Sequence, residues 1–245
     1  MTFENIYKSV MYAIYNTYEC ESTAIYEKVK TKHQMTYKVF IDILSTLQKQ
    51  NCIKVESVNI GVRGGKRSIV LITDAGEQFA LKYFDKVLQE REAEKLLRVH
   101  GTLEHGYFNK YCVDNLKKQR FDVKDEYVDN RFETSLIGEN GQSLICESDF
   151  NIVYNNSRYL FEAETGKCQK ENIYQKLDKV YDLADSDWIA PIMFYICPNK
   201  KACEKVSDAI KIWRQKTGIY DGFDVVVVNA SIRDKIATEI KKVIV

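Results

Sequence analysis

The chain has 245 residues, of which 45% are apolar and 29% charged, so it can bury the core of one large domain or two small ones. Its formal net charge of +1 excludes a globally basic nucleic-acid-binding protein, and any such surface must be local. Since we find no signal peptide, no membrane-length apolar run and no C-x-x-C pair among seven cysteines, we expect a reduced, cytoplasmic protein without membrane contact.

The first predicted elements are three helices followed by a hairpin. Apolar spacing predicts helices over 3–17 and 24–29 and a third helix capped by Thr36. Residues 52–58 and 68–72 have the pattern of two strands, and the glycine-rich basic turn "GVRGGKR" over 61–67 joins them.

This order resembles the winged-helix family over residues 1–84, including the segments "LSTLQKQNCIKV" and "LITDAGEQFA". The resemblance implies that the third helix enters the major groove of double-stranded DNA while the hairpin touches the backbone or minor groove. Winged helices also serve as protein-interaction modules, and surface lysines often only solvate a face, so that alternative stays open. The candidate DNA-binding residues are Lys38, Lys49, Arg63, Lys66 and Arg67.

A charged, amphipathic segment follows the predicted hairpin. Thr73 to Gly76 predict the start of a helix that continues from 77 to about 97. We interpret its later part, 85–100, either as a linker helix or as the contact of a homodimer, and the pattern "KYFDKVLQEREAEKLLR" does not decide between them. Gly101 ends the segment, so we place a second domain at 101–245.

The second domain is predicted as an α/β layered domain with a mixed central sheet, in the order α-β-β-β-α-β-α-β-α. The apolar runs 190–197 and 222–228 predict strands that are buried on both faces. The predicted helices cover 107–118, 173–183, 201–217 and 232–243, and further strands lie at 119–123 and within 148–167.

Three carboxylates mark the hairpin "SDFNIVYNNSRYLFEAETG": Asp149 begins its first strand, and Glu162 and Glu164 end the second. Residues two apart on a strand share a face, and a hairpin brings the start of one strand beside the end of the other. We therefore expect Asp149 close to Glu162, Glu164 or both. Such a cluster needs a proton or a cation, and Mg²⁺ or Mn²⁺ is the expected ion because Mg²⁺ prefers oxygen ligands. The alternative is a set of solvated strand ends.

The same hairpin and the following helix resemble the restriction-endonuclease-like PD-(D/E)xK superfamily, whose motif is an acid, a β-hairpin, acid-x-lysine and a helix. The resemblance covers about 101–228. Within it, "HGYFNKYCVDNL" and "FEAETGKCQKENIYQKLDKVY" are similar to the replication-relaxation family of plasmids and conjugative elements. The resemblance implies a metal-dependent DNA endonuclease of a mobile element, with replication or transfer proteins as partners. It also implies that Glu104, Asp149 and Glu162 bind the metal.

One position departs from the nuclease motif, because Glu164 stands where the motif has lysine. The resemblance allows the basic residue to come from the next helix as Lys176, with Lys167 or Gln175 as substitutes. The expected catalytic set is then Asp149, Glu162, Glu164 and Lys176. The alternative is a catalytically inactive nuclease fold that binds DNA as a replication or transfer accessory or as a transcriptional regulator.

Overall fold

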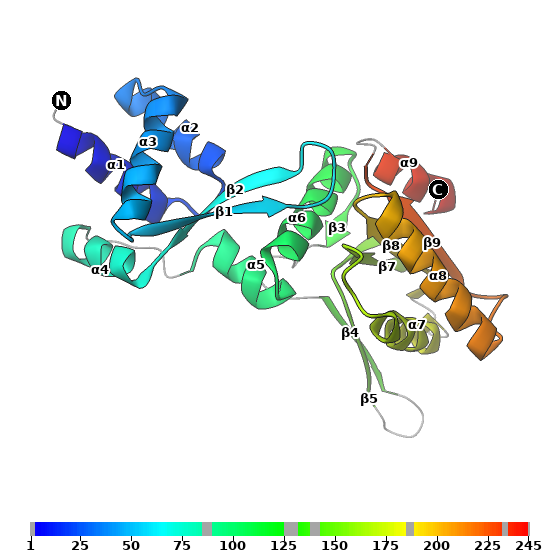
Figure 1. Ribbon diagram of the computed structural model, residues 1–245. Coiled ribbons are helices and arrows are strands. Elements are labelled where there is room, and N and C mark those ends of the chain that lie inside the picture. Colours follow the sequence, from blue (N-terminus) through cyan, green and yellow to red (C-terminus); the bar gives the residue numbers. More distant parts are fainter. Residues whose placement is uncertain are drawn as a thin grey trace. The chain divides into compact units, whose positions relative to one another are not determined.

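The computed structural model describes residues 3–84, 90–124, 132–137, 143–184, 189–231 and 235–244. Contacts within the chain divide it into two compact units (Figure 1). The first consists of Met1–Asn59 and Lys66–Arg98, and the second of Ile60–Gly65 and Val99–Val245. None of the described helices has the length and apolarity needed to span a bilayer.

The first unit contains helices and one antiparallel hairpin, in the predicted order. The third helix begins where Thr36 was expected to cap it, since the Thr36 side chain accepts a hydrogen bond from the Val39 N–H. The buried apolar faces of the first three helices pack together with the hairpin into one core. The elements are α1 (Phe3–Asn16), α2 (Ser22–His33), α3 (Tyr37–Lys49), β1 (Ile53–Asn59), β2 (Lys66–Ile72) and α4 (Asp74–Tyr83).

The predicted continuous helix over 77–97 is wrong. Helix α4 ends at Tyr83, because Phe84 has an extended backbone (φ −129°, ψ 131°), and α5 (Glu92–His100) begins separately. Residues 85–89, the start of the predicted linker helix, lie outside the described residues. Arg91 is buried just before α5 and donates hydrogen bonds to the carbonyl oxygens of Thr17 (3.3 Å) and Val70 (3.0 Å). The beginning of α5 is therefore part of the first unit.

The second unit is built on a mixed sheet with the strand order β3-β6-β7-β8-β9. Strands β3, β6 and β7 are antiparallel neighbours, whereas β7, β8 and β9 run parallel, which confirms the predicted mixed sheet. The elements are α6 (Leu103–Lys118), β3 (Val123–Lys124), β6 (Phe150–Tyr154), β7 (Ser157–Ala163), α7 (Lys170–Ala184), β8 (Ile189–Cys197), α8 (Lys200–Thr217), β9 (Asp224–Asn229) and α9 (Lys235–Ile244).

The side chains of neighbouring residues of β7 lie on opposite faces of this sheet. Leu160 belongs to the core that α7 and α8 form with the sheet. Phe161 stacks instead on Phe150 and Phe194, with ring centroids 4.9 and 4.7 Å apart. Because side chains alternate along a strand, Glu162 returns to the face of Leu160. This alternation places Glu162 on the side from which α7 approaches.

A second hairpin was not predicted. Strands β4 (Phe132–Ile137) and β5 (Ser143–Ser148) pair with each other in antiparallel register outside the main sheet (Figure 1). The sequence there is "KDEYVDNRFETSLIGENGQS", whose polar composition favours a loop. Strand β5 matters for the site because it leads directly into Asp149 and β6.

Candidate functional site

Asp149 is fixed at the junction of β5 and β6. Its backbone N–H donates to the Phe161 carbonyl (3.1 Å), and its Oδ2 accepts the Ala163 N–H (2.8 Å). These bonds bracket Glu162, so the structure brings Asp149 and Glu162 together at one end of the β6–β7 hairpin. The Asp149 side chain is 2% exposed, and a buried carboxylate needs compensating partners.

Two histidines supply those partners. His105 Nε2 lies 3.1 Å from Asp149 Oδ2, and His100 Nδ1 lies 3.5 Å from Asp149 Oδ1. The His100 side chain is fully buried, whereas that of His105 is 22% exposed. A sharp turn brings the two rings together: Gly101 has φ +73°, and the Thr102 side chain accepts the His105 N–H (3.2 Å) to cap α6.

In this cluster, neighbouring charges and burial shift the pKa values of His105 and Asp149 in opposite directions. Burial lowers the pKa of His105, but the charge and hydrogen bond of Asp149, with Glu162 and Glu164 adding, raise the pKa to about 9. Burial raises the pKa of Asp149, yet His105 and His100 hold it well below its usual range. We conclude that Asp149 and His105 form a buried ion pair at neutral pH.

This cluster could hold a metal ion. The ligand atoms of His100, His105 and Asp149 lie within 4.8 Å of one another, and in the described part of the chain no other group of three comes together in this way. Glu104 and Glu162 are not part of the group, and each pairs with a lysine instead. The donors around Asp149 are thus imidazole nitrogens, which do not fit the oxygen set that Mg²⁺ prefers.

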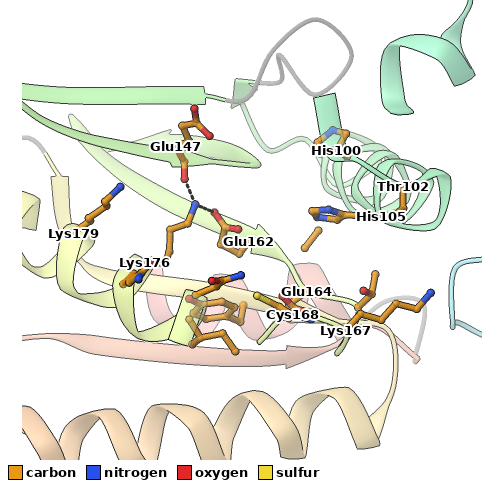
Figure 2. Close-up of a pocket in the computed structure, with 16 residues that line it drawn as sticks. His100, Thr102, His105, Glu147, Glu162, Glu164, Lys167, Cys168, Lys176 and Lys179 are labelled. Carbon is orange, nitrogen blue, oxygen red and sulfur yellow. Dashed lines mark hydrogen bonds and ion pairs between the residues drawn. The ribbon is translucent and has the colours of Figure 1, made fainter. Parts of the chain in front are cut away.

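Glu162 faces Lys176 of α7, as Figure 2 shows. The Lys176 Nζ is 2.8 Å from Glu162 Oε1 and also donates to the Glu147 carbonyl oxygen. Burial raises the pKa of Glu162 to about 7, with Lys176 opposing the shift and Asp149 adding to it. The basic residue that sequence reasoning sought on the next helix therefore contacts the second acid directly.

Glu164 and Glu104 have other partners. Glu164 Oε1 accepts the N–H groups of Gly166 (2.7 Å) and Cys168 (3.3 Å), so this carboxylate caps the turn after β7. Glu104 Oε2 lies 2.5 Å from Lys167 Nζ, and that pair is partly exposed. The structure thus directs Glu164 into the turn and Glu104 toward a lysine.

Glu162, Glu164 and Lys176 line a pocket of about 660 Å³ in the second unit (Figure 2). His105 and the Glu162–Lys176 pair lie on its wall, and Lys167 and Gln175 also belong to the lining. Asp149 is not among the lining residues, but it contacts His105, which is. The arrangement can present an acid with a pKa near neutrality and several positive groups to an anionic ligand.

The predicted DNA-binding residues lie on α3, on β2 and in the turn between β1 and β2. Lys38 and Lys49 are exposed at the beginning and end of α3, and Lys66 is exposed at the start of β2. Arg67 is half-buried, with Nε 3.6 Å from Glu21 Oε1. Arg63 is exposed but belongs to the 60–65 segment of the second unit.

Sequence reasoning missed His100 and the buried Asn109, whose Nδ2 lies 3.3 Å from His100 Nε2. The only sequence signal was a second histidine five positions before His105 across a glycine, which by itself specifies no site. No family model, no curated protein and no solved structure matches the chain. The site must therefore be interpreted from its own geometry.

Proposed function

We propose that the second unit is a metal-dependent phosphodiesterase that acts on DNA. The observation that carries this proposal is the pairing of Glu162 with Lys176 (2.8 Å) in one pocket with His105, which contacts Asp149. An acid, a lysine from the following helix and a preceding aspartate are the groups of the nuclease motif that the sequence resembles.

Each of these side chains has a role that its position supports. Lys176 would balance the negative charge that develops on a phosphate during hydrolysis. Glu162, with its pKa raised to about 7, is suited to accept or deliver a proton near neutral pH. Asp149 would act as a positioning residue that orients His105. When bound at the His100–His105–Asp149 cluster, a divalent ion would polarise a phosphate oxygen and lower the pKa of a bound water.

Mg²⁺ or Mn²⁺ remains the ion that the nuclease motif implies. Held by Asp149 and Glu162, it would have to replace the histidine and lysine partners that these acids have in the structure.

The first unit would bring the nuclease to double-stranded DNA. Its three helices and basic hairpin support the proposal of a winged helix, with Lys38 and Lys66 exposed toward solvent. An origin in a plasmid or conjugative element, with replication or transfer proteins as partners, is supported by the sequence resemblance alone.

The test is cleavage of supercoiled, linear and branched DNA by the full chain with Mg²⁺, Mn²⁺ or Zn²⁺. We expect Lys176→Met to reduce the rate by about 10²-fold or more, since removal of one charge-stabilising group has that effect in other hydrolases. Glu162→Gln should have a comparable effect. Lys211→Met is the matched control, because Lys211 is exposed on α8 and should leave the rate unchanged. Cleavage that survives both pocket substitutions would refute the assigned site.

A second candidate is a DNA-binding protein whose nuclease fold is inactive, with a role as a replication or transfer accessory or a transcriptional regulator. It is favoured by the fact that Asp149, Glu162 and Glu104 all contact basic side chains of the protein itself. Such pairs satisfy the charges without an ion. This candidate predicts DNA binding without cleavage by the wild-type chain under every ionic condition.

A further inference from the structure

We infer that His100, His105 and Asp149 form a binding site for a transition-metal dication such as Zn²⁺. Their ligand atoms lie within 4.8 Å of one another, and the two nitrogen–oxygen distances are 3.1 and 3.5 Å. In a tetrahedral zinc site with bonds of about 2.0–2.1 Å, neighbouring ligand atoms are roughly 3.4 Å apart. The two contacts, which use different oxygens of Asp149, are each close to that spacing, and all three ligand atoms lie within 4.8 Å of one another.

The donor types select the class of ion. Two imidazole nitrogens and one carboxylate oxygen suit Zn²⁺, Fe²⁺ or Ni²⁺, whereas Mg²⁺ and Ca²⁺ are bound mainly by oxygen atoms. Three protein ligands also leave a coordination position open, which is the pattern of catalytic rather than structural zinc sites. His105, whose side chain is 22% exposed, lines the pocket, so the cluster borders the pocket on that side.

Neighbouring groups hold two of the three ligands in place without an ion. Asn109 Nδ2 contacts Nε2 of His100, the nitrogen that does not face Asp149, and the Ala163 N–H binds Asp149 Oδ2. Metal-binding histidines usually have such a partner on their second nitrogen. The Asn109 amide can serve either tautomer of His100 by rotation, because its Oδ1 and Nδ2 exchange places.

The pocket indicates which molecule would occupy the open position. Lys167, Lys176 and Lys179 all line it (Figure 2). A phosphate oxygen is the ligand that this charge pattern and a Zn²⁺-class ion would both favour. The metal site is independent of the proposed nuclease activity, since a chain that cuts no DNA could still bind the ion.

The experiment titrates the chelator-treated full chain with Zn²⁺ by calorimetry and with Co²⁺ by visible absorption, both without DNA. We expect one ion per chain, a visible cobalt spectrum and a rise in the thermal midpoint with Zn²⁺. His105→Ala should weaken binding by at least about tenfold, the scale on which even supporting partners of metal ligands act. His33→Ala is the matched control, because His33 is the remaining histidine of the sequence.

Three results would overturn the inference. One is a wild-type chain that shows no binding, a result that does not depend on the folding of any variant. Another is a thiolate-to-cobalt charge-transfer band, which would assign the ion to cysteines such as Cys168 or Cys203. The third is equal loss of affinity in His33→Ala and His105→Ala. Because DNA is absent, failure here and failure of the nuclease assay are separate outcomes.

Discussion

At the scale of single residues, the buried Asp149 organises its surroundings. A carboxylate that is 2% exposed would be strongly destabilising alone, and the structure supplies a backbone N–H and two imidazoles. The same three side chains can serve as an ion pair or as metal ligands. Which role dominates depends on whether an ion displaces the proton that His105 carries.

The His105–Asp149 pair predicts a specific dependence of stability on pH. The pKa of His105 is raised from 6.5 to about 9, so its stabilisation is present below pH 6.5 and is lost as the pH rises through 9. We expect the metal-free chain to lose on the order of 1–3 kcal/mol of unfolding free energy across this window. Asp149 has a lowered pKa, so its contribution is lost only in strong acid.

Urea unfolding in the presence of a chelator, followed by circular dichroism, measures this loss. His105→Gln should remove most of the decline between pH 6.5 and 9, whereas His33→Gln should retain it. If the unfolding free energies of the wild type and His105→Gln change with pH in the same way, the His105–Asp149 pair does not cause the pH dependence of stability.

Among the site residues, strand periodicity predicted the proximity of Asp149 and Glu162, because pairing and alternation are local rules. The same rule left Glu164 as an alternative neighbour, but Glu164 follows the end of β7 and accepts the N–H groups of Gly166 and Cys168. His100 was missed because its distance to Asp149 depends on how α5 and α6 meet at Gly101. The residue pattern of a single helix or strand does not predict a distance between side chains that lie on different elements.

At the scale of elements, α5 shows how one buried side chain sets a helix position. Arg91 donates to carbonyl oxygens at the end of α1 and within β2, and it is 1% exposed. These contacts attach the beginning of α5 to the first unit, whereas 85–100 was interpreted as a linker helix or a dimer contact. The charged sequence of the segment is compatible with both arrangements, so composition could not decide.

Arg91→Met tests this anchor. We expect it to reduce the free energy of unfolding by about 2–3 kcal/mol, because it removes two hydrogen bonds from a charged donor to buried carbonyls. Arg98→Met is the control within α5, since Arg98 pairs with Glu90 at the surface, and such pairs contribute at most about 1 kcal/mol. Hydrogen exchange of the β2 amides would localise the effect, and equal changes in both variants would contradict the anchor.

Most helices and strands of the fold could be predicted from the spacing of apolar residues and from helix-capping residues. The apolar strands β8 and β9 and the helices α7 and α8 are found within a few residues of their predicted positions. The β4–β5 hairpin was not, because its polar sequence lacks clear alternation and its strands pair only with each other. Apolar periodicity predicts helices and strands that bury one face in a core. It gives little signal for strands that pack against no core.

At the scale of the whole molecule, the candidate DNA-binding side chains are divided between the two units. Lys38, Lys49, Lys66 and Arg67 lie in the first unit, and Arg63 belongs to the second. With a net charge of +1, binding must come from such local groups. Salt dependence can measure each contribution separately.

Lys66→Ala should lower the slope of log affinity against log salt concentration by about 0.9, the value for one lost phosphate contact. Arg67→Ala should change the slope less, because Glu21 lies 3.6 Å from Arg67 and already offsets its charge. Fluorescence anisotropy with labelled duplex DNA is the measurement, with Lys211→Ala as the control. If all three slopes equal that of the wild type, the hairpin plays no part in DNA binding.

The position of Asp149, 44 residues beyond His105, has a consequence for folding. An ion shared by these side chains would cross-link distant parts of the chain in the native state, as a removable covalent bridge would. Bridges that close long loops restrict the unfolded ensemble, while a metal site requires the native arrangement to exist at all. Unfolding of the second unit should therefore release the ion, so that a bound metal would report on native topology.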